Sequence, residues 1–82
     1  MDPAIFGARR RVRRLAIGLS QAALAAGVSV TQPTVYQIES GLIRGSRSTR
    51  QRIEVFLADR ERSAASASAL GEWLRKGQRG TR

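Results

Sequence analysis

Residues 32–37 place two glutamine amides close together, with a tyrosine hydroxyl between them. A glutamine amide donates and accepts hydrogen bonds at once, so Gln32 or Gln37 can form a paired hydrogen bond with adenine N6 and N7. Pro33 can add apolar contact alone, for example with a thymine methyl group. The chain has no Cys and no His, which excludes a thiol nucleophile, a histidine base and a Cys/His zinc site. The protein is therefore expected to bind its partner through hydrogen bonds and apolar contacts, without a cofactor or metal.

Positive charge is concentrated in two clusters on either side of this stretch. The chain carries +9 at pH 7, from 14 Arg, Lys76 and six acids. Residues 1–19 hold five Arg and one acid, residues 42–52 hold four Arg and no acid, and residues 20–41 hold only Glu39. Arginine is well suited to bidentate contacts with phosphate. This distribution of positive charge favours a polyanionic partner. The alternative is that the arginines simply form a solvated surface.

Helix start and stop signals predict the elements that position these residues. Asp2 followed by Pro3 predicts the cap and first residue of a helix. Ser20 and Thr31 are predicted to cap two short helices, the second of which ends at Gly41. Apolar residues of the first helix recur at helical spacing and are expected to face the core. They are Ile5, Ala8, Val12, Leu15, Ala16 and Leu19.

The second half of the chain also has a helical pattern. Ser48 or Thr49 is predicted to cap a fourth helix carrying apolar residues at 53, 56 and 57. The run of Ala and Ser over 63–69 leads into a possible fifth helix. No segment alternates long enough to predict a strand. The fold class is therefore expected to be all-α, a compact domain of four to five helices.

Residues 20–41 have the dimensions of a helix-turn-helix unit, with two short helices joined by about three residues. Ala25 supplies the small side chain that the crossing of two helices requires, and Val28, Val35 and Ile38 point inward. The outward face of the second helix then carries amides and no acid. An ordinary helical hairpin with a solvated polar face is the alternative interpretation.

The stretch IGLSQAALAAGVSVTQPTVYQIESG, residues 17–41, resembles the helix-turn-helix of the phage repressor and Cro family. The similarity covers about residues 10–58 and is most specific over 20–41. It implies a lambda-repressor-like fold in which residues 32–40 form a recognition helix in the DNA major groove. Ser29 stands where the family often has Gly, so either Ser29 takes a left-handed conformation at a small cost in strain, or Gly27 lets the turn start earlier.

The resemblance, together with the charge pattern, leads to a set of expected contacts. The residues expected to reach base edges are Gln32, Pro33, Tyr36 and Gln37. Those expected to contact the DNA backbone are Ser20, Gln21, Thr31, Thr34, Arg10, Arg44, Arg47 and Arg50. The resemblance also implies a structural ion pair between Arg14 and Glu39, joining the first and third helices.

The C-terminal part is larger than a four-helix DNA-binding unit needs. Residues 1–62 are expected to form that unit, residues 63–76 a C-terminal helix, and residues 77–82 a disordered tail. The helix 63–76 either packs on its own core or joins two subunits, and the second is expected because a two-fold dimer adds buried area to a small domain. The dimer interface would contain Leu70, Trp73 and Leu74.

These observations predict a dimeric transcriptional regulator that binds an inverted repeat in double-stranded DNA. A repressor occluding a promoter, which can be its own, is the expected mode, and a phage or plasmid origin fits it. The alternatives are an antitoxin-like or other protein-binding module with autoregulatory DNA binding, and a non-specific nucleic-acid binder. No enzymatic activity, small-molecule effector or membrane association is expected, and the location is expected to be cytoplasmic, at the bacterial nucleoid.

Overall fold

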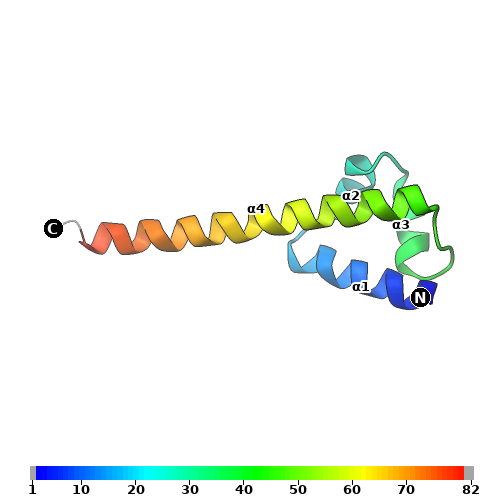
Figure 1. Cartoon of the computed structure of the whole chain (residues 1–82), viewed down its shortest axis with the longest axis horizontal. Helices are drawn as coiled ribbons and strands as arrows, with labels where there is room; N and C mark the ends of the chain where they lie inside the picture. Colours follow the sequence, from blue (N-terminus) through cyan, green and yellow to red (C-terminus); the bar gives the residue numbers. More distant parts are fainter. Residues whose placement is uncertain (1, 81–82) are drawn as a thin grey trace.

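The computed structural model consists of four helices and describes residues 2–80, with side chains through residue 76 (Figure 1). They are α1 (Pro3–Ala16), α2 (Gln21–Gly27), α3 (Gln32–Glu39) and α4 (Arg47–Gly80). No strand occurs within residues 2–80. The predicted all-α class is confirmed.

Three of the predicted caps are formed as expected. The side chains of Asp2, Ser20 and Thr31 accept hydrogen bonds from backbone N–H groups in the first turns of α1, α2 and α3. The cap of α4 lies earlier than predicted, because Ser46 Oγ accepts from the N–H of Thr49 at 3.0 Å. Each polar cap satisfies a donor that has no partner within its helix, which fixes where the helix begins.

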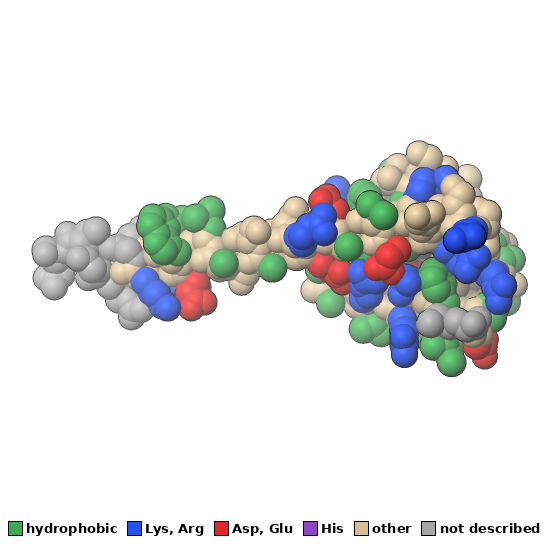
Figure 2. Space-filling view, in the orientation of Figure 1, with side chains coloured by type: hydrophobic (Ala, Val, Ile, Leu, Met, Phe, Trp, Pro, Cys, Tyr) green, Lys and Arg blue, Asp and Glu red, His purple; other side chains and the backbone are tan. Residues whose placement is uncertain are grey.

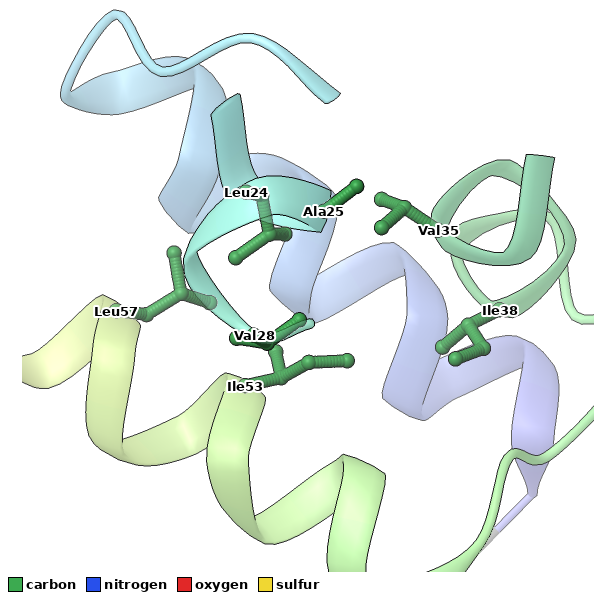
Figure 3. Packing of buried hydrophobic residues seen from close by; sticks show 7 residues of the cluster. All are labelled: Leu24, Ala25, Val28, Val35, Ile38, Ile53 and Leu57. Atoms are coloured by element: carbon green, nitrogen blue, oxygen red, sulfur yellow. The ribbon is translucent and has the colours of Figure 1, made fainter. Parts of the chain in front are cut away.

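The core joins α2, α3 and α4 through seven buried apolar residues (Figure 3). Those residues are Leu24, Ala25, Val28, Val35, Ile38, Ile53 and Leu57. Phe6, Ile17, Leu19, Val30 and Phe56 pack against this cluster from its edge. The predicted inward positions of the helix-turn-helix are therefore the ones that the structure buries.

The predicted inward face of α1 is wrong. Ile5, Val12 and Leu15 are about half exposed or more, and Val12 is 66% exposed. The face turned toward α3 instead contains Gly7, where a Cβ would collide with the backbone carbonyl oxygens of Ile38 and Glu39. Close approach of the two backbones at this glycine determines how α1 is rotated, and the apolar stripe of α1 is left at the surface.

Positive backbone φ angles occur at the turns that flank α2 and α3. Ser29 has φ 61° and is the one non-glycine residue with positive φ within residues 2–80. This is the first of the two expected alternatives, a left-handed conformation that glycine adopts more easily. Gly41, with φ 77°, follows α3 and ends it, as the glycine after a helix commonly does.

The fourth and possible fifth helices are one continuous helix of 34 residues. The Ala/Ser run contains no proline and continues the helix in place of a connection, and α4 includes residues 77–80 of the predicted tail. Residues 81–82 lie outside the described residues. With principal extents of 57 × 22 × 17 Å, the molecule is a small domain from which the distal half of α4 projects (Figure 1). The C-terminal segment therefore does not fold back on its own core.

Ion pairs connect α1 to the half of α4 that lies next to the domain, which contains Glu54 and Glu61. Arg13 donates to both Glu54 and Glu61, with N–O distances of 2.7–3.0 Å, and Arg10 also pairs with Glu54. The hydrogen bond from Arg13 lowers the pKa of the partly exposed Glu61 carboxyl. The same contact raises the pKa of Arg13 above its ordinary value. These pairs fix the direction in which α4 leaves the domain.

Candidate nucleic-acid interface

The outward face of α3 carries the residues expected to reach base edges. Gln32, Pro33, Tyr36 and Gln37 are all exposed, and Tyr36 is 51% exposed. Val35 and Ile38 on the opposite face belong to the core. Apolar anchoring on one face thus leaves a convex polar surface on the other, a shape suited to entering a groove.

A hydrogen-bonded pair of glutamines joins α2 to the start of α3. Gln32 Nε2 donates to Gln21 Oε1 at 2.6 Å, and Gln21 Nε2 donates to Glu39 Oε1 at 3.1 Å. The Gln32 amide keeps one N–H and its carbonyl oxygen for another partner, since a primary amide has two donors and two acceptor sites. The pair therefore holds Gln32 in one orientation while leaving one donor and the carbonyl acceptor of its amide for another partner.

The ion pair expected between Arg14 and Glu39 is present and buried. Arg14 Nε donates to Glu39 Oε2 at 2.7 Å, and Arg14 Nη2 donates to Glu39 Oε1 at 3.0 Å. Arg14 Nη1 also donates to the carbonyl oxygen of Leu19 at 2.7 Å. Both side chains are less than a tenth exposed, so the bidentate geometry and the additional hydrogen bonds are needed to offset the loss of hydration. Glu39 thereby links α1, α2 and α3.

The hydroxyl residues expected at the DNA backbone line the starts of the two short helices. The Thr31 and Thr34 hydroxyls lie 2.8 Å apart, and Thr31 also caps α3. Ser20 Oγ accepts from the N–H of Ala23 at 3.0 Å. Ser20 and Thr31 are exposed, and Thr34 is partly exposed. Ser20 and Thr31 thus cap the two helices directly before Gln21 and Gln32 in the sequence.

The four arginines of residues 42–52, one in the loop after α3 and three in the first turns of α4, divide into two groups. Arg44 and Arg47 have exposed side chains, and Arg50 is partly exposed with a buried Nε that has no partner. Arg52 is structural instead, because its Nε donates to the carbonyl oxygen of Val28 at the end of α2 and its Nη1 to Ser48 Oγ. A cation at the C-terminal end of a helix is favourable there.

Arg10 needs a correction as an expected DNA backbone contact. Its side chain is only 16% exposed, pairs with Glu54, and lies over the Phe6 ring at 4.3 Å from the ring centroid. These contacts make Arg10 part of the interface between α1 and α4. Sequence reasoning also missed the role of Arg13. The seven-residue spacing of Glu54 and Glu61, which places both on one face of α4, is the signal that points to it.

Other kinds of site find no support in the part of the chain that the structure describes. It contains no group of three or more acidic, Cys or His residues placed to hold a metal ion. None of its helices combines the length and apolarity needed to cross a membrane. The polar face of α3 and the arginines near it are the main candidate surface.

Four helices with a capped turn between α2 and α3 define a helix-turn-helix DNA-binding unit. A model of the helix-turn-helix family matches residues 10–53, more than half of the chain. The chain therefore belongs to the helix-turn-helix family of the Cro and repressor type. The match supports DNA binding and transcription regulation in general, and it covers the second half of α1, all of α2 and α3, and the start of α4. A search of curated proteins found no match, and neither did a search of solved structures.

Proposed function

We propose that this protein binds a specific double-stranded DNA sequence as a dimer and represses transcription by occupying a promoter, which can be its own. The observation that carries the proposal is the exposed face of α3, on which Gln21 holds the Gln32 amide in a defined orientation. An oriented amide can discriminate between bases, because adenine N6 donates and adenine N7 accepts along the same edge.

The charge of the domain supports binding to a polyanion. A net charge of +9 attracts the DNA backbone before any base is read. Arg44, Arg47 and Arg50 lie directly after the recognition helix along the chain, and we assign them to phosphate and sugar contacts. Phosphate contacts position a protein on the duplex, whereas base contacts specify the sequence. Ser20, Gln21, Thr31 and Thr34 are assigned to the backbone as well.

The exposed end of α4 supports a dimer. Leu70, Trp73 and Leu74 are each about half exposed or more, and a small protein gains buried area by covering them against a second copy. A two-fold dimer would bind an inverted repeat with half-site centres about one turn, ~34 Å, apart. A partner protein covering the same end of α4, as in an antitoxin, is the second candidate. No catalytic activity or small-molecule effector forms part of the proposal.

Selection of bound sequences from a random DNA pool at near-physiological salt tests the proposal. An enriched inverted repeat is the expected result. An enriched single half-site would support base recognition but contradict the dimer. Binding without enrichment would contradict sequence-specific recognition and favour a non-specific nucleic-acid binder or a protein that needs a partner.

A further inference from the structure

One face of α4 is exposed from the domain, at residue 55, to residue 73 on the projecting part. Val55, Asp59, Ser63, Ser66, Leu70 and Trp73 follow each other at spacings of three and four residues, which places them on one side of a helix. All six are exposed. The face is apolar at both ends and small or polar in its middle. Figure 2 shows hydrophobic side chains gathered on the distal part of α4, beyond the reach of the domain.

The two apolar ends cannot meet within one chain. Val55 is 63% exposed near the domain, and Trp73 is 65% exposed on the projecting part. With 1.5 Å of rise per residue, these side chains are ~27 Å apart along a continuous helix. The ion pairs of Arg13 with Glu54 and Glu61 hold the proximal half in place. Covering both ends therefore requires another molecule.

A groove lies beside the proximal end of this face. It has a volume of about 520 Å³, larger than any single side chain, and its walls include Val55, Phe56 and Gly27. The Phe56 ring packs so closely over Gly27 that a Cβ there would collide with it. The groove thus offers two apolar side chains, Val55 and Phe56, among polar residues that include Gln51, Asp59 and Arg62.

We propose that α4 pairs with α4 of a second copy in antiparallel orientation, so that Trp73 of each copy docks on Val55 of the other. The two-fold axis would cross the helices between Ala64 and Ala65, so that Trp73 of one copy lies within one residue, ~1.5 Å, of the level of Val55 of the other. Residues 63–66, all Ser or Ala, would then meet at the centre, where small side chains let two helices approach closely. Leu74 would lie against Phe56. This inference rests on the proposed dimer and specifies its geometry.

Charge and distance favour this orientation over a parallel pair. A parallel pair would place two strongly basic domains side by side and Asp59 next to Asp59 of the second copy, whereas the antiparallel pair puts the domains at opposite ends. In the proposed register the two Ile53 residues, which belong to the core that supports α3, are ~35 Å apart along α4. This separation is comparable with one turn of DNA, ~34 Å.

Cysteine cross-linking tests the orientation, since the chain has no Cys of its own. The full-length Val55→Cys and Trp73→Cys variants are mixed, oxidised mildly and examined for disulfide-linked dimers. We expect the mixture to cross-link and Val55→Cys alone to remain unlinked, because its two copies are ~28 Å apart along the helices. The pair Ser63→Cys and Ser66→Cys leaves the apolar residues intact and should also cross-link. Sedimentation of the wild-type protein and of each variant accompanies the experiment.

Each outcome identifies what fails. Rapid cross-linking of Val55→Cys alone would establish a parallel pair and overturn the inference. A wild-type dimer in which neither mixture cross-links would place the interface elsewhere, again overturning the inference while the proposed dimer stands. A wild-type monomer that still selects a half-site would overturn both the dimer and the inference. As an independent check, Val55→Asp should weaken dimerisation by on the order of 30-fold while α-helical content is unchanged.

Discussion

At the scale of single residues, the glutamine pair is the feature with the sharpest consequence. Gln32 donates to Gln21 and is exposed, so its truncation should affect reading of the sequence more than general attraction to DNA. We expect Gln32→Ala to lose ~1–3 kcal/mol of binding to the selected sequence and almost none to random DNA. Binding isotherms on both DNAs measure this. Equal losses on both would contradict the assignment of α3 as the recognition helix.

Arg47 and Arg52 provide a matched comparison of a DNA contact with a structural cation. Arg47 is exposed at the start of α4, whereas Arg52 donates to the carbonyl oxygen of Val28. We expect Arg47→Ala to weaken binding to all sequences alike and to reduce the slope of log K against log salt by about one, without changing stability. Arg52→Ala should instead lower the unfolding midpoint. An unchanged salt slope for Arg47→Ala would remove this residue from the phosphate contacts.

At the scale of elements, the crossing of α1 over α3 depends on one glycine. A Cβ at Gly7 would collide with backbone carbonyl oxygens, which cannot rotate away as a side chain can. Gly7→Ala is therefore expected to destabilise the fold by about 1–3 kcal/mol, as overpacking does. Gly71→Ala is the control, because a Cβ there would make only an ordinary contact with the Arg75 side chain, at 3.7 Å, and alanine is the better helix former. Urea unfolding of the two variants should show shifts of opposite sign.

The attachment of α4 to α1 should depend on pH. Arg13 lowers the pKa of Glu61, so the carboxylate stabilises the folded state above the ordinary glutamate value of 4.5. This contribution is lost as the pH falls through the lowered folded-state pKa. Glu61→Gln should reduce stability at pH 7 and flatten the loss of stability on acidification. Urea midpoints at several pH values test this, with Glu72→Gln, at an exposed ion pair, as the control; identical profiles for both variants would contradict it.

Some features of the helices could be predicted from the sequence, and others could not. The caps at Asp2, Ser20 and Thr31 and, as one of two alternatives, the left-handed Ser29 could be predicted, because local hydrogen bonding and backbone geometry determine them. The rotation of α1 could not be predicted, since its amphipathic pattern predicts an inward apolar stripe, whereas the contact with α3 is made at Gly7. The continuity of α4 was also missed. Ser is only a moderate helix former, but nothing in the run blocks helix formation.

The candidate site was predictable in part for similar reasons. The polar face of α3 follows from the motif, whose residues lie close together in sequence, whereas the pair of Arg14 with Glu39 follows from the resemblance to the family. The structural use of Arg10 and Arg13 depends on Glu54, more than 40 residues away from each, and composition alone cannot distinguish a paired arginine from one available to phosphate. The DNA contacts themselves stay predictions until binding is measured.

At the scale of the whole molecule, the length of α4 has a consequence for the distance between the two DNA-binding domains of a dimer. If the antiparallel pair forms, the distance between the two DNA-binding domains is set by the number of residues between Val55 and Trp73. Seven residues inserted in the Ala/Ser run would turn the helix almost two full turns and so preserve the pairing face. The domains would nevertheless move apart by ~10 Å, about a third of a DNA turn.

A single inserted residue would have a different effect from seven, because it rotates the distal half by ~100°. We expect the seven-residue insertion to leave a dimer that binds an isolated half-site with normal affinity. The dimer should lose the additional affinity that comes from binding two half-sites at once, since its domains no longer match the helical repeat of the DNA. The one-residue insertion should give a monomer. Sedimentation and operator binding of the two variants distinguish them. The spacing of the two half-sites that the dimer prefers would thus be determined by the length of α4, whereas the recognition helix would determine only the sequence of each half-site.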